Sequence, residues 1–111
     1  GKGVGDLGFD QLRDRRHLAH HGMVVVQITL ERGGEKLLGE PEFHTRGFIP
    51  EEEKEYYALA GEVVRELVAE QNPDFVGDRE LLREEVRRRL QRFFNRTLQK
   101  RPLILPLILE R

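Results

Sequence analysis

The sequence predicts an α+β fold in which two antiparallel helices pack on one face of a three-stranded sheet, in the order β-β-α-α-β. Three observations predict this fold. Residues 23–30 are rich in β-branched side chains, which favours a strand. Residues 51–71 and 79–101 repeat apolar side chains at helical spacing. Residues 103–109 are apolar at nearly every position, as expected for a last strand that the helix pair returns to the sheet.

Residues 1–22 are interpreted as a linker or entry segment, and residues 23–111 as one small α+β domain. Glycine occupies four of the first eight positions, which favours a flexible start. Asp10 is expected to cap a short helix that runs to about His21, with Gly22 as its stop. A chain of 111 residues has room for one domain with one core.

The strand over residues 23–30 is expected to be central, because it is the most apolar partner available to the second strand. The glycine pair that begins at Gly33 is typical of a hairpin turn. The return strand, about residues 36–48, contains Gly39 and Pro41, which favour an irregular edge strand. The two faces of the central strand are predicted to carry Val24, Val26, Ile28 and Leu30 on one side and Met23, Val25, Gln27 and Thr29 on the other.

Each helix has a recognisable start and end. Pro50 fits a first helical position, and the glutamates after it suit the positive end of the helix dipole. Asn72 and Pro73 end this helix, Asp78 is expected to cap the next one, and Pro102 closes it. The predicted core positions are Tyr56, Ala60, Val63, Val64, Leu67 and Val68 in the first helix, and Leu82, Val86, Leu90, Phe93, Phe94, Thr97 and Leu98 in the second.

Both faces of the last strand are apolar, but the helices can cover only one of them. The leucines at 103, 105, 107 and 109 share one face. An exposed apolar patch marks a partner surface, so the uncovered face is expected to bind a second copy or the rest of a longer chain. The alternative is that the entry segment folds over it. The residues assigned to this uncovered face are Met23, Val25, Ile104, Pro106 and Ile108. Because Pro106 cannot donate a ladder hydrogen bond, one edge of the strand should be free.

The composition excludes several functions. There is no cysteine, which excludes disulfides, thiolate metal sites and a cysteine nucleophile. There is also no serine, so threonine is the only residue type left with an aliphatic hydroxyl. Lysine plus arginine (19) nearly balances aspartate plus glutamate (20), which argues against a wholly basic coat but not against local patches. No apolar run approaches the ~20 residues of a membrane span, and no signal peptide opens the chain, so a soluble cytoplasmic protein without a membrane partner is expected.

Two patterns near the start of the chain have a functional and a structural interpretation. Residues 3–8 match G-x-G-x-x-G, but that motif binds a pyrophosphate only between a strand and a helix, so a linker is favoured. His17, His20 and His21 have a helical spacing that could bind zinc. The neighbouring arginines oppose a dication, so a solvated surface or a phosphate contact is favoured. Pairs of acidic residues are best explained as solvated helix faces, and no intrinsic active site is expected.

The strongest local signal is a separation of charge between the two helices. Residues 51–71 hold seven glutamates against two basic residues, whereas residues 79–101 are rich in arginine. Rows of arginine four residues apart could follow an RNA backbone, and the alternative is that the acidic helix neutralises its basic neighbour. The candidate RNA contacts are Arg83, Arg87, Arg88, Arg92 and Arg96.

Several stretches resemble one bacterial family. Residues 4–8 (VGDLG), 12–18 (LRDRRHL) and 22–26 (GMVVV) resemble the end of the linker and the start of the C-terminal domain of ribonuclease J. Residues 45–48 (TRGF) resemble its Ser-Arg-Gly-Phe stretch, and residues 101–106 (RPLILP) resemble its closing strand. The match covers nearly the whole chain in order. It departs from the family at His20-His21, where acidic residues are usual, and at Ile49-Pro50.

The resemblance implies a parent enzyme of the metallo-β-lactamase/β-CASP family, with 5′-to-3′ exonuclease and endonuclease activity on RNA. Such a parent uses two divalent metal ions, zinc or manganese, held by a His-x-His-x-Asp-His motif and further residues of the catalytic core. That motif is absent here, so no catalytic or metal-binding residue carries over and no cofactor is expected in this segment. The resemblance assigns the domain to oligomerisation, to contact with its own catalytic core and to support of activity, with RNA as a further possible partner.

Overall fold

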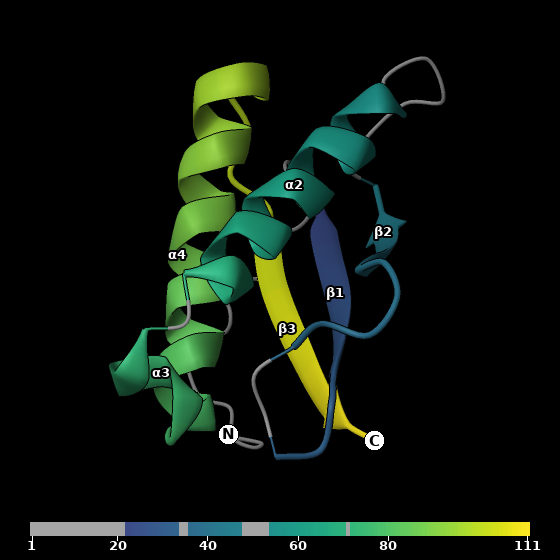
Figure 1. The fold of residues 1–111 in the computed structure, drawn as a ribbon. Helices are drawn as coiled ribbons and strands as arrows, with labels where there is room; N and C mark the ends of the chain where they lie inside the picture. The colour runs from purple at the N-terminus through teal and green to yellow at the C-terminus, as the bar shows by residue number, and fades with distance from the viewer. Residues whose placement is uncertain (1–21, 34–35, 48–53, 71) are drawn as a thin grey trace, which may run out of the picture.

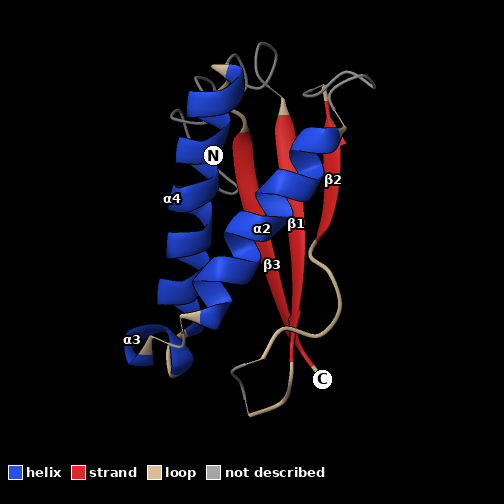
Figure 2. Ribbon diagram, turned by 45° about the horizontal axis from the view of Figure 1, so that its top comes forward, coloured by secondary structure: helices blue, strands red, loops and turns tan. Residues whose placement is uncertain are grey.

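The computed structural model describes residues 22–33, 36–47, 54–70 and 72–111, which form one open sheet covered on one face by helices (Figures 1 and 2). This arrangement confirms the predicted α+β class. The expected helix from Asp10 and the expected helix start at Pro50 lie outside the described residues. The elements in chain order are β1 (Met23–Leu30), β2 (Glu42–Arg46), α2 (Glu55–Ala69), α3 (Pro73–Val76), α4 (Arg79–Leu98) and β3 (Leu103–Glu110).

The strand order is β2-β1-β3, which confirms that residues 23–30 form the central strand. β2 pairs antiparallel to β1, with Met23 opposite Arg46. β3 pairs parallel to β1 over its full length, from Met23 opposite Leu103 to Leu30 opposite Glu110. Of the return strand predicted at about residues 36–48, only Glu42–Arg46 form β2. The described residues just before it, 36–41, contain Gly39 and Pro41 and form no continuous strand, as those two residues predict.

The helix ends follow the capping residues of the sequence. The Asp78 side chain accepts hydrogen bonds from the backbone N–H groups of Glu80 (3.0 Å) and Leu81 (3.2 Å), which confirms it as the cap of α4. α4 ends at Leu98, and its C-cap Gln99 takes a left-handed conformation (φ 55°). The sequence prediction missed α3. The Asn72 side chain caps this single turn, so the Asn-Pro pair that ends one helix also begins the next.

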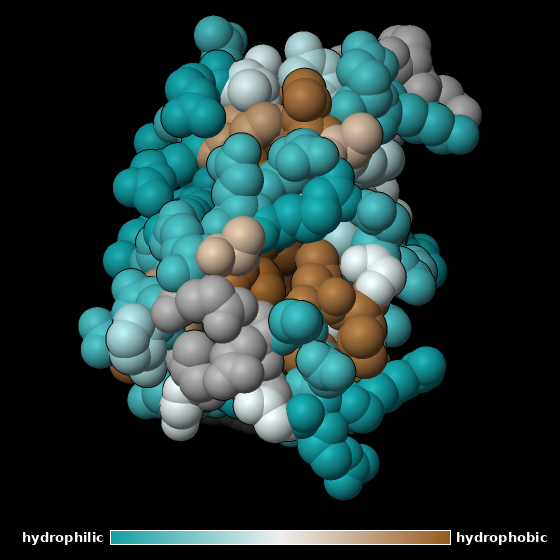
Figure 3. All heavy atoms as spheres, in the orientation of Figure 1, coloured by the Kyte–Doolittle hydropathy of each residue, from teal (hydrophilic) through white to brown (hydrophobic). Residues whose placement is uncertain are grey.

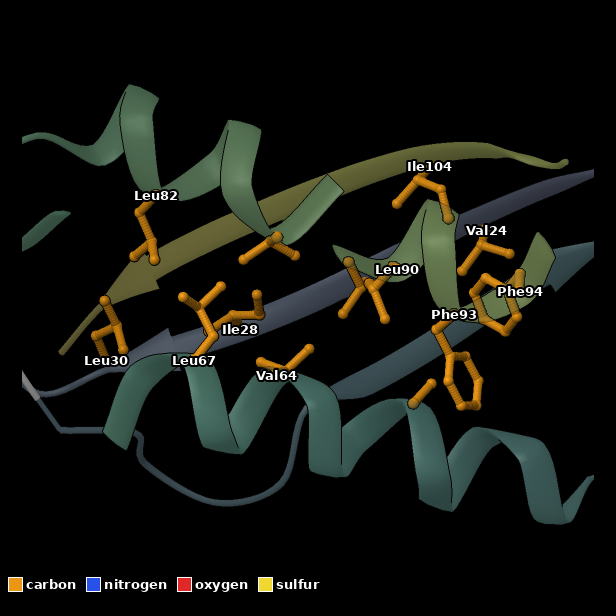
Figure 4. Packing of buried hydrophobic residues seen from close by; sticks show 13 residues of the cluster. Val24, Ile28, Leu30, Val64, Leu67, Leu82, Leu90, Phe93, Phe94 and Ile104 are labelled. Carbon is orange, nitrogen blue, oxygen red and sulfur yellow. The ribbon is translucent and has the colours of Figure 1, made fainter. Parts of the chain in front are cut away.

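The core lies between the sheet and the two long helices, where β1 contributes Val24, Val26, Ile28 and Leu30 (Figure 4). α2 crosses the sheet obliquely, whereas α4 lies beside β3 (Figure 2). Both predicted helical stripes face this core. The buried helical residues are Ala60, Val64 and Leu67 of α2 and Leu82, Val86, Leu90, Phe93 and Phe94 of α4. On the helix-bearing side the surface is mostly hydrophilic, with hydrophobic residues visible in a hollow below α2 (Figure 3).

The predicted orientation of β3 was wrong. Ile104 is 1% exposed in the core, and Ile108 packs against the core. Pro106 stands opposite the fully buried Val26, so it lies on the same helix-facing side. The parallel register sets this orientation, because directly paired residues share a face and even-numbered residues of β1 point to the helices. Of the residues expected on the uncovered face, Met23 and Val25 lie there, whereas Ile104, Pro106 and Ile108 do not.

Gly22 fixes the point where the chain enters β1. Its φ is +81°, and a Cβ atom there would lie 2.5 Å from the backbone oxygens of both Arg46 and Gly47. Its carbonyl also accepts a hydrogen bond from the N–H of Leu103 at 3.0 Å. Only glycine fits this conformation beside the end of β2 without strain.

Candidate functional site: the α4 arginines and the outer surfaces of the sheet

The five predicted arginine contacts lie on α4 and divide into two groups. Three of them form ion pairs one turn apart within the helix: Arg83 with Glu80 (2.7 Å), Arg87 with Glu84 (2.5 Å) and Arg88 with Glu85 (3.1 Å). The hydrogen bond from Arg87 lowers the pKa of the Glu84 carboxyl below its usual value.

Arg92 and Arg96 form the second group. Both are exposed, and neither makes an ion pair with any residue in the described part of the chain. The hydrophilic area on the left of Figure 3 is the side on which α4 lies. α4 therefore offers solvent two arginines without a described partner, two paired with the exposed glutamates Glu80 and Glu84, and Arg88, whose partner Glu85 is only 14% exposed.

A sixth arginine, which the sequence prediction missed, connects the two long helices. Arg89 donates two hydrogen bonds to the carboxylate of Glu70, the C-cap of α2 (2.8 and 3.0 Å), and one to Glu85 (2.8 Å). These bonds, those with Glu70 first, raise the pKa of the Arg89 guanidinium, and the same pairing lowers the pKa of Glu70. The four-residue spacing of Glu85 and Arg89 was the available signal. The acidic helix thus neutralises α4 at Arg89, and the predicted arginine rows remain on the outer surface.

The sheet face that no described helix covers changes from apolar to charged across its three strands. β3 contributes Leu105, Leu107 and Leu109, which are 42%, 47% and 36% exposed. The side chains of β1 on this face are half-buried and begin with Met23 and Val25. β2 contributes Glu42, His44 and Arg46, which stand opposite Gln27, Val25 and Met23. We call this surface the open face. Its apolar part lies over β3 and β1.

A groove of about 370 Å³ runs along the outer edge of β3 below α4. The edge is free of any described strand, as the proline in β3 predicts. Arg83, Glu84 and Arg87 line one side of the groove, and residues 104–108 line the other. We call this the edge groove. It combines an aliphatic floor with two guanidinium groups and the carboxylate of Glu84, which is paired with Arg87.

A second groove of about 280 Å³ lies between β2 and α2. Phe43 and Tyr57 stack there with ring centroids 6.1 Å apart, and the Tyr57 hydroxyl hydrogen bonds to Thr45 at 2.8 Å. Arg65 pairs with Glu40 and Glu62 at the end of this groove. Its one cation is therefore held between two carboxylates.

The described residues form neither a metal-binding cluster nor a membrane-spanning helix. Among the described residues, no group of three or more His, Asp or Glu side chains is placed to hold a metal ion. No helix among them is both long and apolar enough to cross a bilayer. The candidate zinc residues His17, His20 and His21 and the glycine motif at residues 3–8 lie outside the described residues.

The order of elements, the parallel outer strand and the helices on one face define a small α+β domain with an open sheet. The model of the ribonuclease J C-terminal domain family matches residues 10–111, and the chain belongs to this family. It is 37% identical over 111 residues to ribonuclease J2 of Bacillus subtilis. It is 32% and 30% identical over the same length to proteins named ribonuclease J 2 in Staphylococcus epidermidis and Staphylococcus aureus. The alignments cover 99% of this chain but only 20% of each relative.

Proposed function

We propose that this chain is a non-catalytic C-terminal domain of a ribonuclease J-like, RNA-degrading enzyme, and that its open face serves oligomerisation and supports activity. The observation that carries the proposal is the row of leucines on β3. Leu105, Leu107 and Leu109 occupy alternate positions along β3, so their side chains follow one another on the open face, and each is at least 36% exposed. Removing such a surface from water stabilises an assembly by about 25 cal/mol per Å².

The size of the open face sets the strength expected of this association. Three strands about 4.8 Å apart and eight residues of about 3.3 Å rise give a patch of roughly 14 by 26 Å. That is less than the ~800 Å² that each partner buries in a standard interface. Two isolated domains should therefore associate weakly, and a contact that includes the parent's catalytic core should be tighter.

The chemistry of the proposed parent belongs to the four-fifths of its length that this chain does not span. In that parent, two divalent metal ions, zinc or manganese, would activate the attacking water in the catalytic core. The described residues of this chain provide no cluster of metal ligands for such a site. We place the parent in the cytoplasm, where RNA is degraded.

Sedimentation velocity of the chain over a range of concentrations tests the proposal. Self-association, or binding to a separately produced catalytic core, should be lost when Leu105 and Leu107 are both replaced by aspartate. The matched control is Leu81→Asp, because Leu81 lies on α4 and is 46% exposed, against 47% for Leu107. A monomer at high concentration that also fails to bind the core would contradict the proposal, as would equal effects of the two sets of variants.

The second candidate function is RNA binding through α4, and the observation that favours it is the exposure of Arg92 and Arg96 without described partners. Binding of single-stranded RNA should weaken with salt by a slope of about −0.7 per phosphate contact. The triple change of Arg88, Arg92 and Arg96 to glutamate should remove it, whereas Arg32→Glu, in an exposed loop, should not. No measurable affinity in low salt would refute this function.

A further inference from the structure

The outer edge of β3 exposes backbone hydrogen-bonding groups in a regular pattern. The N–H of Leu103 donates to Gly22, and the N–H of Arg111 donates to Leu30 (2.9 Å). The backbone groups of odd-numbered residues therefore point to β1, and those of even-numbered residues point outward. Ile104, Ile108 and Glu110 direct both N–H and C=O away from the sheet. Such an edge is a template for another strand.

Pro106 stands in the middle of this edge, at an outward-pointing position. It removes no bond from the ladder with β1, but it leaves a gap in the row of outward donors. Pairing between two copies of β3 would bring two such gaps to the interface, one from each Pro106, whereas an added strand without proline would meet only one. The edge therefore favours a proline-free segment of another protein over a second copy of this strand.

The arginines above the edge add a charge pattern that matches a strand. Arg83 and Arg87 are one helical turn apart, which is about 6 Å along α4. Alternate residues of an extended chain are about 6.6 Å apart. Two carboxylates at positions i and i+2 of an added strand could therefore reach both guanidinium groups. The present partners, Glu80 and Glu84, are mostly exposed and compete weakly, because such surface pairs contribute little.

We infer that the edge groove binds a short extended peptide by strand addition, with acidic side chains at i and i+2 under Arg83 and Arg87. The alternate side chains of this peptide would point to the other side of the sheet, beside Leu105 and Leu107. Aliphatic residues fit there. The occupant is thus an alternating acidic and aliphatic segment of a partner protein, and main-chain pairing supplies affinity while the side chains supply specificity.

The groove suits a peptide better than RNA. Its floor is formed by isoleucine, leucine and proline, and none of the described residues that line it is aromatic. Single-stranded RNA binding usually relies on aromatic residues that stack on bases. An aliphatic floor beside backbone donors and acceptors that pair with no described strand is instead the environment of a strand in a sheet.

The test is a nuclear magnetic resonance titration of the chain with a capped octapeptide that alternates valine and glutamate. The control peptide has the same composition, with four glutamates followed by four valines. The alternating peptide should shift the amide signals of Ile104 and Ile108, and it should bind at least about tenfold more tightly than the block peptide. Only the alternating peptide places every glutamate on one face and every valine on the other, whereas the consecutive glutamates of the block peptide would put an i+1 carboxylate beside the leucines of β3.

Two protein variants localise the interaction. Replacing Arg83 and Arg87 with glutamate should weaken binding by about tenfold, through loss of two surface ion pairs and added repulsion. The same replacement of Arg92 and Arg96 should change it less than twofold, because neither lines the groove. Pro106→Val restores an outward donor and should strengthen binding by about fivefold, the value of one hydrogen bond.

Several outcomes would overturn the inference. Equal affinity for the two peptides, shifts confined to other surfaces, or equal effects of the two arginine pairs would each do so. Binding of an octauridylate at Ile104 and Ile108 in place of the peptide would assign the groove to RNA. If the Arg83 and Arg87 variant loses its dispersed spectrum, the peptide pair and Pro106→Val still decide the question. Failure here leaves the oligomerisation proposal intact, because that proposal depends on the leucine side chains of the open face.

Discussion

Replacing Gly22 with alanine should destabilise the domain more than the same change at any glycine where a Cβ has room. The left-handed conformation at φ +81° costs a non-glycine residue about 1–2 kcal/mol. The new Cβ would also lie 2.5 Å from the backbone oxygens of Arg46, the last residue of β2, and of Gly47 after it. Relieving that contact must move the start of β1 away from β2 or β3, with loss of one or two hydrogen bonds at about 1 kcal/mol each. The expected total is about 2–4 kcal/mol.

Urea unfolding followed by circular dichroism measures this loss, which is a large part of the roughly 5–15 kcal/mol stability of a typical domain. Gly39→Ala is the matched control, because Gly39 also has a positive φ (72°) but no heavy atom within 4 Å of a Cβ. That variant should lose only the conformational part, about 1–2 kcal/mol. A loss at Gly22 no greater than the loss at Gly39 would refute the close approach between the start of β1 and the end of β2.

Three further changes test the helices. Gly61→Ala should stabilise the domain by up to about 1 kcal/mol, because a Cβ there meets nothing within 4 Å and alanine is the better helix former; a lower urea midpoint would contradict this. Asp78→Ala should cost about 1 kcal/mol by removing the cap of α4, measured in the same way. Arg89→Gln should flatten the acid dependence of stability. Arg89 lowers the folded-state pKa of Glu70, so their pairing contributes to folding stability above the unfolded pKa of about 4.3. That contribution is lost as the pH falls through the folded-state pKa. The wild type should therefore lose more stability than the variant between pH 7 and pH 3.

The periodicity of the sequence was sufficient to predict the helices and the central strand. Apolar residues separated by four and then three positions, as at Val86, Leu90 and Phe93, share one face on a helix but not on a strand, and the structure buries all three. Capping chemistry is equally local, so Asp78 could be identified without knowledge of the fold. α3 was missed because one turn contains too few residues to show a period, although Asn72 and Pro73 mark its start.

The orientation of β3 could not be predicted, because residues 103–109 are apolar at every position and give no alternation. The register with β1 decides which side faces the helices, and register depends on the length and path of the whole α2–α4 connection. The sequence does contain a hint in retrospect. Ile104, a β-branched residue, is the one that packs beside Val24 under the helices, whereas the flexible leucines remain on the open face.

The surface position of the α4 arginines could be predicted from the sequence, but their ion-pair partners could not. Arginine rows on an amphipathic helix must lie on its outer face, so Arg83 to Arg96 could be placed on the surface without coordinates. Their ion pairs could not be deduced from the charge summed over each helix. Each arginine has possible partners both three residues away in its own helix and among the glutamates of the neighbouring helix. The structure shows that the near partners are used, as for Arg83 and Glu80, and that Arg89 makes the described link to α2.

β3 contributes to two surfaces, the open face and the outer edge of the sheet. Substitutions can alter one without the other, because the two surfaces are formed by alternate residues of the strand. Odd-numbered residues place leucine side chains on the open face, whereas even-numbered residues direct their backbone groups outward at the edge. Pro106 lies on the helix-facing side, so Pro106→Val changes the edge and leaves the leucines unaltered. If assembly depends on the open face, this variant keeps the oligomeric state of the wild type while it alters binding at the edge. The same variant becoming a larger assembly would show that the proline prevents edge-to-edge pairing, which is the usual reason for a proline in such a strand.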